Sequence, residues 1–468
     1  MTQFPKRTSL SGVADALDPL TKAIADHVAG SLDRGLTEEV REKTRDHLID
    51  TVAATISGSR LPAGVAALRY VQTLGGLPQA GVTGSGGLRT NVVNAALANA
   101  MSAHGDETDD FHMASITHPG CAVVPAALAV GESEGLSGAD LLAAVSVGYD
   151  ICGRVPVSVD CYRQFKAGRG MHALGGMFGA AAAASAMLRF SPKQVADAMS
   201  FTAQQASGLT CWRRDEAHIE KAFDFAGMPA RNGVMSAGMV ACGMPGVPDA
   251  MTGVNGLFQV NAPEGFDWAA PWADLSTRAE VLSSSIKKWS VGSPGQAALD
   301  AVTALMEAND LQANEIESIA IHLPDDVSHI VDEGGAPNVN IRHLVAMCVV
   351  DRGLGFASTH DETRLDDPVV GALRDRARVV PSAELTVARP RRQAIVEIAC
   401  KDGRNLRHHA QVVRGTPDDP MSRAEVLDKA RDLIAPVMGK DRCSKILKAL
   451  ERIETIPDLR TFSALLTE

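Results

Sequence analysis

Residues 175–190 read GGMFGAAAAASAMLRF, a run of alanine, glycine and large apolar residues with a single charge at Arg189. Alanine is the best helix former, and small side chains let neighbouring helices pack closely. The run is shorter than the roughly 18–20 apolar residues that a membrane-spanning helix needs. It therefore predicts a tightly packed helix inside a helical domain, and no membrane span.

Further helices are predicted on both sides of this run. Residues 36–59, LTEEVREKTRDHLIDTVAATISGS, begin with Thr37 as a plausible N-cap and carry apolar residues at amphipathic spacing. Residues 137–155 and 191–209 each begin with a serine before a polar first turn, which is a helix start signal. We expect the first 270 or so residues to form an all-α domain.

The pattern changes after about Pro271. Residues 315–326, 382–389 and 393–413 read as β-strands, with KDGR at 401–404 as a hairpin turn and a helix predicted over 293–310. From residue 416 the pattern is helical again. We therefore predict a mainly α protein. A large all-α helical domain over 1–275 is completed by C-terminal helices over 416–468, and a smaller α+β lid domain spans 276–415.

Composition excludes several classes of protein. The chain has 468 residues, of which 45% are hydrophobic, and a formal net charge of −11, so nothing favours a nucleic-acid partner. The N-terminal residues 1–20 lack the apolar core of a secretory signal, which makes the cytoplasm the expected location. The eight cysteines form no CxxC pair and no zinc signature, so we read them as small buried hydrophobes.

The stretch AHGDETDDFHMASITHPG, residues 103–120, holds four acids and three histidines between two apolar segments. One interpretation is a carboxylate and histidine constellation for acid–base catalysis or for metal binding. The other is a solvated loop, or acids that cap helices. The apolar flanks do not decide between these interpretations.

Three further stretches bear on binding. In FKAGRGMHALGG, residues 165–176, Arg169 and His172 precede the Gly/Ala helix, whose N-terminus would favour an anion. A structural histidine is the alternative.

In CWRRDEAHIEKAFDFAGMPARNGV, residues 211–234, Lys221 and Arg231 belong to a group of cations beside aromatic residues. That grouping suits a polycarboxylate pocket, although a charged helix face is the alternative. The stretch SSSIKKWSVGSPGQ, residues 283–296, places Lys287 before a helix start and is a weak anion signal.

Taken in order, five stretches resemble the MmgE/PrpD family over nearly the whole chain. They are residues 44–59, 94–129, 169–185, 220–233 and 286–301. The resemblance implies a helical domain with a smaller α+β lid, a cleft between the domains, a homodimer, and chemistry without a metal or organic cofactor.

By position, the resemblance implies that the catalytic residues are His118, His172, Lys221, Lys287 and Glu107. Arg169, Arg231, Asp110, Phe111 and His112 are the expected substrate contacts, and no metal ligand is expected. Where some members have Asp-Phe-Asp-Asp-Thr, this chain has ETDDF at 107–111, so we expect a substrate preference of its own.

The expected chemistry begins with proton removal alpha to a carboxylate. This step places negative charge on a group that is already anionic, so it needs fixed cations and a base that is neutral near pH 7. We therefore expect a cofactor-independent lyase, either a dehydratase or a decarboxylase, acting on a small di- or tricarboxylate.

Three other functions stay open at this stage. An epimerase of the iminodisuccinate type would use the same carbanion. A metal-dependent hydrolase would use Asp109, Asp110, His112 and His118. A non-catalytic carboxylate binder would follow from the departures at Glu107 and Phe111.

Overall fold

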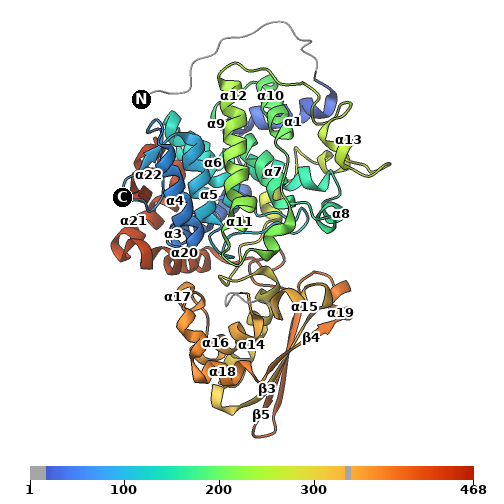
Figure 1. The fold of residues 1–468 in the computed structure, drawn as a ribbon, viewed down its shortest axis with the longest axis vertical. Helices are drawn as coiled ribbons and strands as arrows, with labels where there is room; N and C mark the ends of the chain where they lie inside the picture. Colours follow the sequence, from blue (N-terminus) through green and yellow to red (C-terminus); the bar gives the residue numbers. More distant parts are fainter. Residues whose placement is uncertain (1–16, 333–338, 468) are drawn as a thin grey trace. The chain divides into compact units, whose positions relative to one another are not determined.

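The computed structural model describes residues 17–332 and 339–467, so most of the segment 1–20, on which the absence of a secretory signal was predicted, lies outside the described residues. The protein divides into two compact units (Figure 1). Unit 1 comprises residues 1–284 and 426–468, and unit 2 comprises residues 285–425. The mainly α prediction is confirmed, because helices far outnumber strands in the described residues.

Unit 1 is built from helices and one two-stranded antiparallel ribbon. The α-helices are α1 (Pro19–Ala29), α2 (Ser31–Arg34), α3 (Glu38–Gly58), α4 (Pro62–Leu74), α5 (Val92–Ala103), α6 (Pro119–Glu134), α7 (Gly138–Val157), α8 (Cys161–Lys166), α9 (Met171–Met187), α10 (Pro192–Gln204), α11 (Ile219–Ala222), α12 (Met228–Ala241), α13 (Leu257–Asn261), α20 (Arg423–Met438, which begins in unit 2), α21 (Lys440–Leu450) and α22 (Leu459–Thr467). The ribbon pairs β1 (Ala80–Gly81) with β2 (Arg89–Thr90), so this unit is not strictly all-α.

Shorter helical turns join these elements. Four of them are 3₁₀ turns and one is a π-helical turn: η1 (Thr210–Arg214), the π turn η2 (Phe223–Gly227), η3 (Ala270–Trp272), η4 (Glu280–Ser283) and η8 (Ile453–Thr455).

The Gly/Ala run forms α9, and every residue of this helix is buried. It packs against α6, α7 and α12 (Figure 1). The approach to α7 requires glycine: a Cβ built on Gly179 would lie 2.7 Å from the carbonyl oxygen of Gly148. No helix in the described residues is long and apolar enough to cross a bilayer.

The predicted starts of three helices are confirmed, and each of these helices begins at a capping side chain. The Thr37 hydroxyl accepts the Val40 amide at the start of α3. Ser137 and Ser191 each form a capping box at the starts of α7 and α10. Each of these caps satisfies backbone donors that would otherwise lack a partner at a helix N-terminus.

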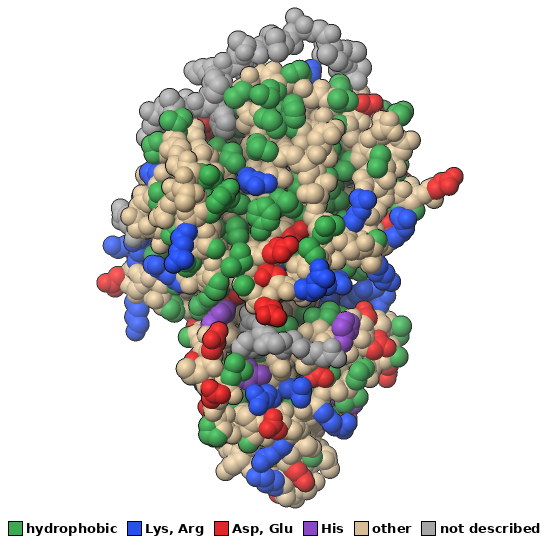
Figure 2. Space-filling view, in the orientation of Figure 1, with side chains coloured by type: hydrophobic (Ala, Val, Ile, Leu, Met, Phe, Trp, Pro, Cys, Tyr) green, Lys and Arg blue, Asp and Glu red, His purple; other side chains and the backbone are tan. Residues whose placement is uncertain are grey.

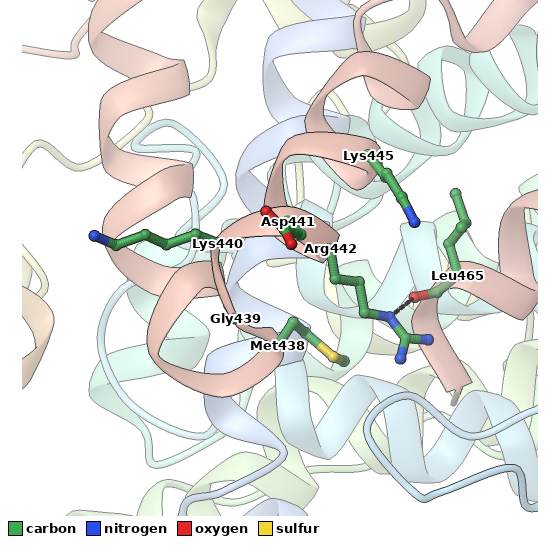
Figure 3. A pocket seen from close by; sticks show the side chains of 7 residues that line it. All are labelled: Met438, Gly439, Lys440, Asp441, Arg442, Lys445 and Leu465. Carbon is green, nitrogen blue, oxygen red and sulfur yellow. Dashed lines mark hydrogen bonds between the residues drawn. The ribbon is translucent and has the colours of Figure 1, made fainter.

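The last helices of the chain belong to unit 1. The Arg442 guanidinium of α21 donates from Nε to the carbonyl oxygen of Leu465 at 2.8 Å, which satisfies a carbonyl at the C-terminus of α22 (Figure 3). An open hollow of about 490 Å³ lies beside this contact, lined by Lys440, Lys445 and neighbouring residues. Its lining residues lie outside the stretches 103–120, 165–176, 211–234 and 283–296, which contain the candidate site residues.

Unit 2 combines a four-stranded sheet with helices. Its elements are η5 (Ser293–Gly295), α14 (Gln296–Asn309), η6 (Ala313–Glu315), β3 (Ile316–Pro324), α15 (Asp325–Asp332), α16 (Ile341–Asp351), α17 (Phe356–Thr359), η7 (Glu362–Asp366), α18 (Pro368–Arg374), β4 (Ala377–Ser382), α19 (Ala383–Val387), β5 (Ala394–Cys400) and β6 (Asn405–Ala410). The strand order is β4-β3-β5-β6; β3 and β4 run parallel, and the other pairs are antiparallel.

Most of the strand predictions in unit 2 are confirmed. The hairpin at 401–404 joins β5 to β6, and alternate residues of β5 are buried beneath α14. The strand predicted at 382–389 is wrong, because Ala383–Val387 forms the short helix α19 and the strand β4 precedes it. The Ser382 hydroxyl accepts the Leu385 amide, and this N-cap favours a helical turn over a strand at that point.

Candidate functional site

The acidic stretch forms the connection between α5 and α6, and its carboxylates are buried. Asp109 and Asp110 are inaccessible to solvent, and Glu107 is 7% exposed. The interpretation as a solvated loop is therefore wrong. Buried carboxylates are retained where hydrogen bonds or ion pairs compensate the loss of water, so the partners of each acid indicate its role.

Asp109 binds two histidines. Its Oδ2 accepts a hydrogen bond from Nδ1 of His104 at 2.9 Å, and its Oδ1 accepts one from Nδ1 of His118 at 3.1 Å. Because an ionised carboxylate only accepts, each ring carries its hydrogen on Nδ1. In the neutral ring, Nε2 is then the nitrogen with a lone pair.

Asp110 anchors helices. Its carboxylate accepts hydrogen bonds from Nδ1 of His47 at 2.7 Å, from the Tyr149 hydroxyl at 2.5 Å and from the Gly120 amide at 2.9 Å. These partners lie on α3, α7 and α6. Burial alone would raise the pKa of Asp110, but the hydrogen bonds from His47 and Tyr149 outweigh it and hold the pKa below its usual value.

His172 lies in the first turn of α9, with its ring stacked on Phe225 at a centroid distance of 3.6 Å. The ring of His118 is 5.5 Å away. Burial, together with the neighbouring histidines and Lys221, holds the pKa of His172 well below its ordinary value of 6.5. His172 is therefore neutral at physiological pH and able to accept a proton.

Lys221 reaches this cluster from α11. Its ammonium group forms an ion pair with Glu107 and lies 5.2 Å from the ring centroid of Phe225. The π-helical turn η2 follows at once and carries Phe225, whose ring contacts His104, His118 and His172. π-Helical turns insert one residue into a helix and are frequent at functional sites.

Phe111 and His218 complete the surroundings. The Phe111 ring lies 5.4 Å from that of His118. His218 has φ +57°, a left-handed backbone conformation that is uncommon for a residue with a side chain, and its ring centroid is 5.2 Å from that of His104. Burial and the charge of Lys221 lower the pKa of His218 to about 3.

A lysine from the C-terminal part of the chain holds the acidic stretch. The ammonium group of Lys429, on α20, donates to the carbonyl oxygen of Thr108 at 2.8 Å and pairs with Asp50 at 2.6 Å. Lys429 thereby fixes the backbone between Glu107 and Asp109.

The predicted site residues fall into three groups. The structure brings together Glu107, Phe111, His118, His172 and Lys221, all in unit 1. Lys287 belongs to unit 2. The third group was predicted to contact substrate. The polar contacts that the structure gives for these residues are with groups other than the side chains of the first group.

The members of this third group are Asp110, already described, and three others. Nδ1 of His112 is 2.7 Å from the Ser115 hydroxyl, and its Nε2 is 3.3 Å from Glu280. The guanidinium of Arg169 donates to the Asn261 side chain. Arg231 donates to Asn232 and covers the ring of Phe223. A substrate-binding role for these four residues stays a prediction.

Sequence reasoning did not place His104, His218 or Phe225 in the site, and it named Asp109 only for the alternative metal-dependent hydrolase. Their roles depend on contacts between segments that are far apart in the chain. The stretches 103–120 and 211–234 contain all four residues. No spacing of residues within them indicates that one carboxylate binds two histidines.

Comparison with known proteins matches both parts of the chain. The MmgE/PrpD N-terminal domain matches residues 22–269, and the MmgE/PrpD C-terminal domain matches residues 289–455. The cis-aconitate decarboxylase of Homo sapiens is 22% identical, with 96% of this chain and 95% of that protein covered. The cis-aconitate decarboxylase-like protein oryM of Aspergillus oryzae is 25% identical, with 92% and 93% covered. The cis-aconitate decarboxylase of Mus musculus is 21% identical, with 96% and 94% covered.

Proposed function

This chain belongs to the MmgE/PrpD family, and from that premise we propose that it is a lyase, a decarboxylase or a dehydratase, acting on a small di- or tricarboxylate. One observation carries the proposal: the neutral imidazole of His172 lies in the same buried cluster as the ammonium group of Lys221. A base and a fixed cation are the two groups that proton removal alpha to a carboxylate requires.

In the proposed first step, His172 accepts the proton on the carbon alpha to a substrate carboxylate. The electrons of the broken C–H bond move onto that carboxylate as an enolate. Lys221 stabilises this extra charge, and its effect is large because the cluster is buried and little water screens it. Lys287 of unit 2 is proposed as a second cation for the same charge.

In the proposed second step, His118 acts as the acid. The hydrogen bond to Asp109 stabilises the protonated form of His118, so the ring can deliver a proton from Nε2. In a dehydration the proton goes to the departing hydroxyl group. In a decarboxylation two protons return, because carbon dioxide leaves its bonding electrons on the carbon skeleton: one comes from His118, and the proton held by His172 goes back to the skeleton as carbon dioxide leaves. Glu107, paired with Lys221, is proposed to orient that lysine and to exchange protons with the substrate.

The epimerase is the second candidate, because it also uses two acid–base groups. Epimerisation needs them on opposite faces of one carbon. The rings of His118 and His172 are in contact, with centroids 5.5 Å apart, which favours two groups acting from one side. The lyase is therefore preferred over the epimerase.

The metal-dependent hydrolase is less favoured, because only Asp109 and His118 of its four residues bind each other, and the other two have separate partners. Asp110 binds His47 and Tyr149, and His112 binds Ser115 and Glu280. The non-catalytic binder is disfavoured by the buried base of His172 beside the half-buried cation of Lys221.

We further propose that the protein forms a homodimer in the cytoplasm, that unit 2 is a lid, and that the reaction uses no cofactor. The half-buried residues Met228, Met235 and Met239 follow one side of α12. Figure 2 shows hydrophobic side chains gathered on unit 1 in the area where Figure 1 draws this helix. A helix face of this kind, rich in methionine and interrupted by Arg231, suits a second copy of the chain.

The test is a panel of small di- and tricarboxylates incubated with the protein in heavy water and followed by NMR, with EDTA present. Loss of carbon dioxide or water from one substrate is expected. Deuterium alpha to a carboxylate without net loss of substrate would indicate the epimerase. Turnover that requires added metal would indicate the hydrolase, and binding without any exchange would indicate the non-catalytic binder.

A further inference from the structure

Three imidazole nitrogens in the cluster are buried and have no hydrogen-bond partner among the described residues. They are Nε2 of His104, Nε2 of His218 and Nδ1 of His172, and the first two belong to neighbouring rings. His104 is wholly inaccessible to solvent. Buried polar atoms in folded proteins nearly always have a partner, so two unpartnered nitrogens side by side indicate a missing ligand.

Both rings offer a nitrogen to one carboxylate. One ring nitrogen of His104, one of His218 and a carboxylate oxygen of Glu107 all lie within 4.8 Å of one another. Because Nδ1 of His104 is bonded to Asp109, Nε2 is the atom that this ring offers. Ligands of a tetrahedral zinc ion with bonds of about 2.0–2.1 Å are about 3.4 Å apart. Small side-chain rotations would therefore close the three groups around one ion.

The groups behind these ligands also fit a metal. The Asp109 carboxylate accepts the Nδ1 hydrogen of His104, and a carboxylate in this position orients a metal-binding histidine and raises its basicity. His218 is held in its strained left-handed conformation, and such strain is concentrated at ligand sites.

A second group of residues meets the same distance limit but fits less well. In His104, Asp109 and His118, both rings already donate from Nδ1 to the carboxylate. A metal there would have to replace two existing hydrogen bonds. In the group with His218, the nitrogen that His104 offers is Nε2, which has no hydrogen bond to lose.

We propose that His104, Glu107 and His218 form a binding site for a divalent transition metal of the zinc type, and that the bound ion inhibits the enzyme by taking Glu107 away from Lys221. Two imidazoles and one carboxylate suit Zn²⁺, Co²⁺ or Ni²⁺ and do not suit Mg²⁺ or Ca²⁺, which prefer oxygen ligands. The inhibition rests on the lyase function proposed above, whereas the binding site does not.

The binding test uses the full chain, stripped of metal with EDTA and desalted. Titration with ZnCl₂ by calorimetry is expected to give one tight site. CoCl₂ is expected to give the visible absorption of a tetrahedral ion. X-ray absorption of the zinc form is expected to show two imidazoles in the first shell. MgCl₂ is expected to give no binding.

Variants locate the site. His104→Asn and His218→Asn are each expected to weaken zinc binding at least 10-fold. The matched control is His343→Asn in unit 2, which removes another buried histidine with unpartnered ring nitrogens and is expected to leave zinc affinity unchanged. If either site variant is unfolded by circular dichroism, the imidazole count in the wild-type spectrum decides instead.

The inhibition test is separate. One equivalent of ZnCl₂ is expected to stop turnover, and EDTA is expected to restore it. The absence of stoichiometric zinc binding, or binding that survives in both folded site variants, overturns the site. Zinc that binds without slowing turnover overturns the inhibition. Zinc binding to a protein that turns over no carboxylate leaves the site intact and removes the proposed lyase function.

Discussion

The Nδ1 atom of His118 lies 3.1 Å from Oδ1 of Asp109, so the carboxylate determines which nitrogen of this ring carries hydrogen. The other oxygen of the same carboxylate does this for His104 at 2.9 Å. One buried acid therefore sets the hydrogen positions of two histidines, one in the proposed lyase chemistry and one in the proposed metal site.

Replacing this acid tests that arrangement. Asp109→Asn presents an amide group that can donate, so His118 can adopt the wrong tautomer. Turnover should fall on the order of 100- to 10,000-fold, the range for losing a positioned acid or base. The measurement is kcat on the substrate found by the carboxylate panel, with circular dichroism as the control for folding. Near wild-type turnover in a folded variant would remove Asp109 from the mechanism.

The neighbouring acid should behave differently. Asp110→Asn weakens the buried hydrogen bonds to His47 and Tyr149, so the free energy of unfolding should drop by about 2–4 kcal/mol. The KM of the folded protein should not change. Urea unfolding and steady-state kinetics give the two quantities. A raised KM with unchanged stability would instead support the substrate contact predicted from the sequence.

The buried histidines should make stability depend on pH. The pKa of His172 in the folded protein lies below 6.5, so below that pH the unfolded chain binds a proton that the folded chain does not. The free energy of unfolding should therefore decrease as the pH falls from about 6.5 to 5, by up to about 1.4 kcal/mol per pH unit for each such histidine.

His218 adds to the same trend, because its pKa of about 3 is also lowered by burial. His172→Gln should flatten the slope of the stability curve measured by urea unfolding at several pH values. A slope identical to that of the wild type would show that His172 titrates normally.

Lys429 should matter for stability through Asp50. Lys429→Met leaves the buried Asp50 carboxylate without its cation, which should cost about 3–5 kcal/mol of unfolding free energy. The exposed Lys440→Met on α21 is the matched control and should change little. The double variant Asp50→Asn, Lys429→Met should recover part of the loss. Equal stability of the Lys429 and Lys440 variants would contradict this role.

Phe111 is expected to influence substrate choice. Phe111→Thr removes an aromatic ring that lies 5.4 Å from His118 and supplies a hydroxyl group. Relative kcat/KM values across the carboxylate panel should change by about 10-fold or more, as they do when a pocket wall loses several carbons. An unchanged order of substrates would place specificity elsewhere in the site.

Local signals in the sequence predicted much of the fold. The caps at Thr37, Ser137 and Ser191 fixed helix starts correctly because capping involves only neighbouring residues. The prediction failed at 382–389, where a short β-branched segment is helical from Ala383. Periodicity in such short segments does not separate strand from helix.

The site was only partly predictable. Motif resemblance identified His118, His172 and Lys221, and the structure brings these three side chains together. It did not identify Asp109 as the acid that binds two histidines, nor His218 and Phe225 as members of the cluster. These contacts form where α5, α9, η2 and the connection before α6 pack together. No single stretch of the sequence predicts that packing.

The discontinuity of unit 1 has a consequence for biosynthesis. Unit 1 takes in residues 426–468, and Lys429 from this part holds the Thr108 carbonyl inside the acidic stretch. On the ribosome, the first 284 residues and all of unit 2 are made before Lys429 emerges. Until then Asp50 lacks its cation and the Thr108 carbonyl lacks its donor, so unit 1 stays incompletely folded, and its apolar surfaces are exposed to aggregation or to chaperones.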